Sequence, residues 1–118
     1  MQKECHIFQA LNFIGKRWTL LILLELYKGK QKWKRYSELK AKLLDITPKI
    51  LSSRLNELKK EKIIQKKVNA HRVPIVSNYA LIKKGEELIC VIKQIKDWSL
   101  RWNKIQGCDK VECKNCLV

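Results

Sequence analysis

The chain has 118 residues and a formal net charge of +15 at neutral pH, from 26 Lys/Arg and 11 Asp/Glu. This length suits one domain with a modest core. No apolar run reaches the roughly 18 residues that a membrane span needs. The first residues also lack the basic-then-apolar layout of a signal peptide, so we expect a cytoplasmic protein without a membrane partner.

The positive charge is concentrated in the middle of the chain. Residues 28–72 hold 15 of the Lys/Arg and only 4 of the Asp/Glu, a net charge of +11. A distribution this one-sided attracts polyanions, meaning nucleic acid or an anionic membrane surface. A lysine-rich composition can also reflect growth at high temperature. We interpret the charge as favouring nucleic acid.

The first third of the chain predicts two helices. Residues 5–15 form a short apolar helix that ends at Gly15, which suits a C-cap. A second helix is expected over residues 16–27, stopping at Gly29. It should form the centre of the core through one strongly apolar side, made by Trp18, Leu21, Ile22, Leu24 and Leu26.

Two further helices follow in close succession. After a basic connector that contains Trp33, Ser37 is expected to cap a short helix through Leu44, with Leu39 and Leu43 facing inward. A tight link then leads into a helix over residues 46–62. Two short helices joined this closely predict a helix-turn-helix.

The helix over residues 46–62 has two different faces. Thr47 is a good N-cap, and Pro48 then occupies the first helical position, where its missing N–H costs nothing. An inward stripe is formed by Leu51, Leu55 and Leu58. The outward side opens with short polar side chains and ends with lysines: Lys49, Ser52, Ser53, Asn56, Lys59 and Lys60. Such a face suits a DNA major groove, although a solvated amphipathic helix would show the same pattern.

After residue 62 the apolar period changes to that of strands. Residues 63–68 and 76–81 predict a hairpin whose tip carries His71 and Arg72. A hairpin placed after a helix-turn-helix is a wing. The sequence therefore predicts a winged helix-turn-helix, mostly α with a small β-hairpin wing (α+β). Its domain covers residues 1–106, followed by a Cys-rich tail over residues 107–118.

The last helix, over residues 84–103, carries a narrow apolar seam. The spacing of 3, 4, 3 and 4 residues is that of a heptad seam and predicts a homodimer; packing on its own domain is the alternative. Its positions are Leu88, Val91, Ile95, Trp98 and Trp102.

Several blocks of the sequence, in this order, resemble the HxlR family of winged-helix regulators, relatives of the MarR type. They are Cys5 before the first helix, GKRW (15–18), RYSELK (35–40), ITPKILSSRLNELKKEKII (46–64) and KKGEEL (83–88). The chain departs from the family at His6, where proline is usual, and at Ile82, where a capping threonine is usual. Its connector before Arg35 is longer and more basic, and the tail after Gln106 has no counterpart.

This resemblance implies a dimeric, sequence-specific binder of double-stranded DNA that regulates transcription, with repression as the expected sign. Dimer contacts from the first and last helices are implied, and these would include Phe8 and Leu11 beside the seam. Several members of the family sense oxidants through the N-terminal cysteine. The last helix is expected to start late or to fray, because Ile82 cannot cap it.

Each group of candidate DNA-binding residues has its own expected role. Base edges are the expected targets of Lys49, Ser52, Ser53 and Asn56, on the helix that Thr47 caps. Arg54 either contacts phosphate, which we favour, or supports the helix. The start of the preceding helix should attract phosphate, and the wing tip should reach a minor groove or phosphate. The residues at the start of the preceding helix are Arg35, Tyr36 and Ser37, and those at the wing tip are His71 and Arg72.

The remaining chemistry-bearing side chains leave alternatives open. Trp18 and Trp33 are expected to be structural, with base stacking as the alternative for Trp33. Cys90 is expected in the core. The other cysteines are idle, form a redox switch or disulfide, or bind zinc, which needs a fourth ligand; they are Cys5, Cys108, Cys113 and Cys116. No cofactor or effector is identified.

These residues bear on three classes of function. A transcriptional regulator explains the polar start of the candidate DNA helix, whereas a non-specific coating or architectural protein would need only the charge. A thiol oxidoreductase using CKNC (113–116) is disfavoured because the pair lacks a βαβ context. We therefore expect a DNA-binding regulator and no enzyme.

Overall fold

The computed structural model describes residues 4–102 and 112–115. Five α-helices, a three-stranded sheet and a short 3-10 helix make up this part of the chain, in the order of a winged helix-turn-helix. The elements are α1 (His6–Ile14), α2 (Thr19–Tyr27), β1 (Lys34–Arg35), α3 (Tyr36–Lys42), α4 (Pro48–Lys60), β2 (Ile64–Asn69), β3 (Val76–Leu81), α5 (Lys83–Trp102) and η2 (Cys113–Asn115). The predicted fold class is confirmed. The predicted boundary between residues 106 and 107 lies outside the described residues.

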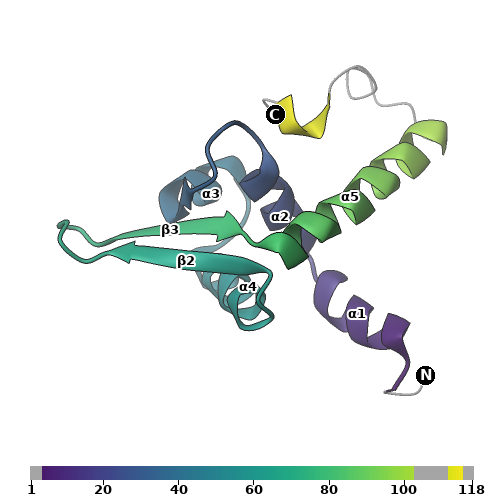
Figure 1. The fold of residues 1–118 in the computed structure, drawn as a ribbon, viewed down its shortest axis with the longest axis horizontal. Helices are drawn as coiled ribbons and strands as arrows, with labels where there is room; N and C mark the ends of the chain where they lie inside the picture. The colour runs from purple at the N-terminus through teal and green to yellow at the C-terminus, as the bar shows by residue number, and fades with distance from the viewer. Residues whose placement is uncertain (1–3, 103–111, 116–118) are drawn as a thin grey trace.

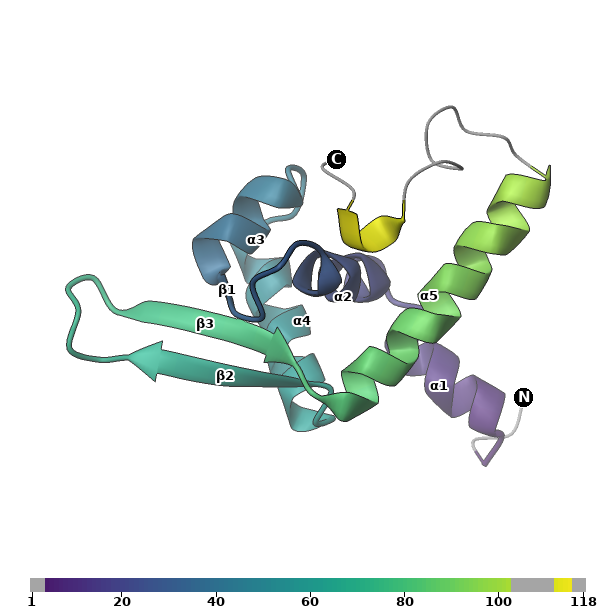
Figure 2. The same ribbon diagram turned by 45° about the horizontal axis from the view of Figure 1, so that its top comes forward.

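The elements divide the molecule into a body with two projections. The β2–β3 wing extends to one side of the body in Figure 1, and α1 and the far end of α5 extend to the other. Figure 2 shows α2 in the middle, with α3 and α4 on the wing side. The elements predicted to bind DNA and the predicted dimer helices therefore occupy opposite ends.

Helix α2 lies at the centre of the core, where it contacts α1, α3, α5 and β3. Ile22 and Leu23 are fully buried, whereas Leu21 is 48% exposed. The expectation that Leu21 faces the core was therefore wrong. An almost wholly apolar helix carries no periodic signal for its buried side, so only packing could choose Leu23 over Leu21.

The start of α2 also differs from the prediction. The helix begins at Thr19 rather than at residue 16, because Trp18 has a φ of 83°, in the left-handed region. This backbone turn separates α1 from α2, whose axes differ by 70°. Within the described residues, no single helix has the length and hydropathy to cross a membrane; α1 and α2 meet that test only as a bent pair.

The sheet has one strand more than the predicted hairpin. Strand β3 pairs antiparallel with β2 along six residues of each strand and with β1 on its other side. Because Arg35 is paired with Asn78, extended backbone leads directly into α3 at Tyr36. The expectation that Ser37 caps this helix was therefore wrong. The cap position is Arg35, and its side chain forms no capping bond.

Helix α5 begins at Lys83, on the base of the wing. The backbone N–H of Ile82 donates to the Ile63 carbonyl (3.0 Å), and the Ile82 carbonyl accepts from Glu86 (2.9 Å). A Cβ atom on Gly85 would lie 2.4 Å from the Ile63 oxygen, so glycine permits this close approach. The expected late start or fraying does not occur: the helix begins at Lys83, and the backbone bond to Ile63 fixes the residue that precedes it.

The buried side of α5 consists of Gly85, Ile89 and Ile92. Cys90, expected in the core, is exposed instead. It lies one position away from Ile89, and a single residue rotates the side-chain direction by about 100° around a helix. The sequence Ile89-Cys90-Val91 is apolar throughout, which is why its pattern did not reveal this.

The short η2 helix returns to the end of α2. The Gly29 N–H donates to the Lys114 carbonyl at 2.9 Å. The Nζ atoms of Lys93 and Lys114 lie 5.3 and 5.6 Å from the centre of the Tyr27 ring. A hydrogen bond with Tyr27 raises the pKa of Lys93. This part of the tail therefore packs against the end of α2.

A candidate nucleic-acid interface on the wing side

The first turn of α4 is built as the sequence predicts. The Thr47 Oγ1 atom accepts a hydrogen bond from the Ile50 N–H at 3.2 Å, and Pro48 occupies the first turn. Leu51, Leu55 and Leu58 are at most 1% exposed. Burial of this stripe fixes which side of α4 faces outward.

The outward side of α4 presents the predicted polar residues to solvent. Lys49, Ser52, Ser53 and Asn56 are exposed, as are the lysines at the end of the helix. Within the described part of the chain, no hydrogen bond or ion pair occupies the side chains of Lys49, Ser53 and Asn56. These donors and acceptors remain available for an external partner.

Tyr36 joins the start of α3 to the start of α4. Its hydroxyl donates to the Pro48 carbonyl at 3.2 Å and lies 3.4 Å from the Ser52 Oγ atom. The ring is half-buried and packs against the core. Tyr36 therefore orients the first turn of α4, and the predicted phosphate contacts of Arg35, Tyr36 and Ser37 stay predictions.

Arg54 has partners inside the chain. Its Nε donates to the Arg17 carbonyl at 3.2 Å, and its Nη1 lies 3.3 Å from the Glu57 carboxylate. Glu57 also pairs with Lys16 at 3.1 Å. These contacts favour the supporting role that the sequence allowed for Arg54 over the phosphate contact.

The wing tip is open to solvent. His71 and Arg72 are exposed, and Val73 is 99% exposed. The His71 N–H donates to the Asn69 side chain at 3.1 Å, which forms a local turn at the end of β2. This turn presents the two basic side chains beyond the end of the sheet.

Basic and aromatic residues beside the wing were not predicted as a site. Lys66 lies 5.8 Å from the centre of the Tyr79 ring, and Lys67 lies 5.7 Å from that of Trp33. Burial raises the pKa of Tyr79. The adjacent lysines at 66 and 67 signalled positive charge, but their faces and aromatic partners depend on strand pairing.

Lys34 holds the connector between α2 and β1. Its Nζ donates to the carbonyls of Leu26 (3.1 Å), Lys28 (2.6 Å) and Gln31 (2.9 Å). Burial lowers the pKa of its ammonium group. One side chain thus fixes the end of α2 and the loop that carries Trp33, a role with no local sequence signal.

The cysteines are divided between described and undescribed residues. Cys5 is half-buried at the N-cap of α1. Cys108 and Cys116 lie outside the described residues, as does the side chain of Cys113. In the described part of the chain, no three His, Cys, Asp or Glu residues gather as metal ligands. The zinc alternative for the tail therefore stays a prediction.

Known proteins that are similar to this chain share its winged helix-turn-helix architecture. The model of the HxlR-like helix-turn-helix family matches residues 13–106. The chain is 33% identical over 94 residues to the uncharacterized HTH-type transcriptional regulator YvaP of Bacillus subtilis (strain 168). That alignment covers 80% of this chain and 83% of YvaP.

Two solved structures share the fold. A MarR-family transcriptional regulator from Porphyromonas gingivalis W83 superposes with a TM-score of 0.75 and 27% identity, covering 89% of this chain and 97% of that one. The redox regulator HypR in its oxidized form gives a TM-score of 0.72 at 27% identity, covering 86% and 100%. The chain belongs to the HxlR-like helix-turn-helix family of MarR-like winged-helix transcriptional regulators, and it is not an enzyme.

Proposed function

We propose that the protein is a homodimeric repressor that recognises a specific double-stranded DNA sequence. The observation that carries this proposal is the outward face of α4, where Lys49, Ser53 and Asn56 are exposed beside Ser52. Side chains of these types pair with base edges: asparagine with adenine, lysine with guanine, and serine with several edges. A coating protein needs only positive charge, and would not need this polar face.

The predicted dimer helices support the homodimer. Along the seam of α5, Val91, Ile95, Trp98 and Trp102 are 40%, 48%, 55% and 75% exposed. Leu88 differs from them, because it is half-buried against the core of its own subunit. A row of exposed large apolar side chains on one helix face suits burial against a second subunit.

Helix α1 carries exposed apolar side chains of its own. Ile7 and Leu11 are 62% and 55% exposed, Phe8 is half-buried, and no residue of α1 is buried. A nine-residue helix is too short to be stable alone in water. A second subunit packed on α1 would supply the missing burial and set two α4 helices about one DNA turn apart.

Redox control through Cys5 is part of the proposal. Cys5 is the N-cap residue of α1, which we assign to the dimer interface. The link that follows α1 is joined to α4 by the Lys16–Glu57 ion pair. Oxidation of Cys5 would therefore act on α1, which is joined through this link to α4, the helix proposed to bind DNA. The similar protein HypR is a redox regulator; the tail cysteines remain candidates for the resolving thiol.

A competition mobility-shift assay tests the function. The probe is the DNA upstream of this protein's own gene, with excess random duplex as competitor and protein that is either fully reduced or mildly oxidised. We expect a reduced-protein shift that survives the competitor and is lost on oxidation. The Cys5→Ser variant should keep the shift under both conditions.

The outcomes separate the parts of the proposal. A shift that random duplex erases, together with no enrichment from a library of random duplexes, would favour the coating alternative. A specific shift that oxidation does not change would remove redox control and keep the regulator.

A further inference from the structure

We propose a second DNA-contacting surface beside the wing, which binds phosphates of the duplex flanking the operator. It rests on the proposed DNA-binding function and extends it from the start of α3 and the wing tip, represented by Arg35 and His71, to the solvent face of the sheet. We call this surface the connector–wing platform and define it as Lys32, Trp33, Arg35, Lys67, His71 and Asn78.

Strand register places the platform on one face of the sheet. Arg35 is paired with Asn78, and Asn78 is paired with Lys67, so these three residues form a row across all three strands. Directly paired residues point to the same face of a sheet. The adjacent row contains Tyr79, which is 6% exposed and belongs to the core. The row of Arg35, Asn78 and Lys67 therefore lies on the solvent face.

Trp33 separates two open hollows on this face. One hollow of about 500 Å³ lies between Trp33, Lys67, His71 and Asn78. The other, of about 480 Å³, lies between Lys32, Trp33, Arg35 and Asn78, with Glu38 at its edge. The two linings together contain three lysine or arginine side chains, three amides, His71 and one carboxylate around a single indole ring, and Val68 and Ala70 complete the first hollow. Pockets for small molecules are enclosed and mostly apolar. An open surface with basic and amide side chains is better suited to the phosphate backbone of a nucleic acid.

The platform is held in place rather than carried on a loose loop. Lys34, next to Trp33, binds three carbonyls of α2 and the connector. Lys67 lies over the Trp33 ring, 5.7 Å from its centre. Fixing the connector, Trp33 and Lys67 before binding reduces the conformational entropy that a phosphate contact of Lys67 would cost.

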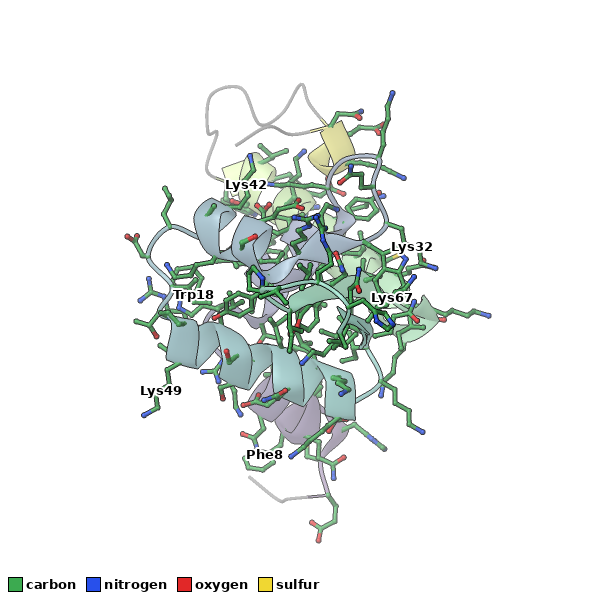
Figure 3. All side chains as sticks on the ribbon, turned by 90° about the vertical axis from the view of Figure 1, so that its left-hand side faces the viewer. Phe8, Trp18, Lys32, Lys42, Lys49 and Lys67 are labelled. Atoms are coloured by element: carbon green, nitrogen blue, oxygen red, sulfur yellow. The ribbon has the colours of Figure 1, made fainter. Side chains whose placement is uncertain are left out.

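The platform and the start of α4 lie on different sides of the wing. Figure 3 shows Lys32 and Lys67 near each other on one side, with Lys49 on the opposite side. When α4 occupies a major groove and the wing tip the neighbouring minor groove, the platform faces the DNA beyond the wing. The chain would then cover flanking phosphates without reading their sequence.

The test compares two charge-matched double variants. Lys32→Gln with Lys67→Gln removes two charges from the platform. Lys42→Gln with Lys83→Gln removes two charges from exposed positions elsewhere. Each protein is titrated with a duplex limited to the operator and with one extended by about ten base pairs of random sequence at each end, roughly one helical turn.

We expect the wild type and the control to bind the extended duplex more tightly than the short one. The gain in wild-type affinity from the extended duplex should be roughly tenfold at low salt, and the platform variant should lose it. Its salt slope on the extended duplex should fall by about 1 for each lysine that leaves a phosphate. The length of DNA that the platform variant protects from hydroxyl radicals should be shorter at both ends than with the wild type.

Equal wild-type affinity for both duplexes would overturn the platform, and so would equal losses by the two double variants. These results are distinct from failure of the proposed function, in which no sequence is preferred. The salt slope on a long random duplex still tests the platform in that case, because phosphate contacts carry no sequence information.

Discussion

The Nε atom of Arg54 donates a hydrogen bond to the carbonyl oxygen of Arg17, 3.2 Å away, and joins α4 to the link between α1 and α2. Glu57 strengthens the connection, because its carboxylate pairs with both Arg54 and Lys16. The helix proposed to read DNA is thereby fixed to the helix proposed to form the dimer. A movement of α1 would be transmitted directly to α4.

Glu57→Gln tests this connection. Two partly exposed ion pairs are lost, so the free energy of unfolding should fall by about 1 kcal/mol in urea titrations. Removing a negative charge near DNA would by itself strengthen binding, so weaker operator binding would show that Glu57 positions α4. Glu61→Gln is the matched control, at the exposed end of the same helix. If both variants bind more tightly, the positioning role is wrong.

Asn56→Ala and Ser53→Ala test base recognition. Each should weaken operator binding by about 1–3 kcal/mol while leaving random-duplex binding unchanged, because contacts to base edges carry the sequence information. Lys59→Gln is the comparison, since a phosphate contact would weaken binding to all sequences alike. Fluorescence anisotropy with both kinds of duplex measures the difference. Uniform losses for Asn56→Ala would remove it from the base-reading set.

Thr47→Ala tests the cap of α4. The Thr47 side chain is exposed and accepts only from the Ile50 N–H within the described residues, so its loss should cost about 1 kcal/mol of stability. Thr47→Ser keeps the accepting oxygen and should remain near wild-type stability. Urea unfolding followed by circular dichroism gives both values. Equal stability of the two variants would show that the cap does not stabilise the helix.

Lys34→Met tests the fixed connector. Three carbonyls lose a charged donor, and we expect a loss of about 1–3 kcal/mol in stability. Lys32→Met, two residues earlier in the connector before β1, replaces an exposed side chain and should change stability by less than about 0.5 kcal/mol. The difference in unfolding free energy between the two variants is the measurement. A stable Lys34→Met protein would mean that water replaces the ammonium group at these carbonyls.

Ile95→Lys tests the dimer seam. Ile95 is 48% exposed in one subunit, so a lysine there should leave the subunit folded but should disrupt the apolar interface. Gln94→Lys, at an exposed polar position beside it, should leave the dimer intact. Sedimentation equilibrium distinguishes the two states. A wild-type monomer, or an Ile95→Lys dimer as stable as wild type, would contradict the proposed interface.

The parts of the fold that the sequence predicts are those governed by neighbouring residues. Thr47 and Pro48 define the start of α4 because a cap acts within one turn. The inward stripe of Leu51, Leu55 and Leu58 follows from helical periodicity, and all three are buried. The seam of α5 was predicted from the same periodicity; Val91, Ile95, Trp98 and Trp102 are exposed, whereas Leu88 is half-buried against the core.

The failed predictions concern residues whose environment depends on distant segments. Ser37 has the chemistry of a cap, but the pairing of Arg35 with Asn78 places the start of α3 two residues earlier. A two-residue strand such as β1 has too few residues to show an alternating pattern. Trp33 acquires its neighbours, Lys67 and Asn78, only when that strand forms.

The sequence by itself determined the order of the five helices and the hairpin, the two faces of α4 and the basic middle of the chain, because periodicity and charge are properties of neighbouring residues. The tertiary structure decided which side of the apolar α2 is buried, placed Cys90 on the surface and gave Arg54 and Lys34 their partners. Arg54 and Arg17 are 37 positions apart. Contacts across such a separation depend on how helices dock, and docking is chosen by the packing of the whole core.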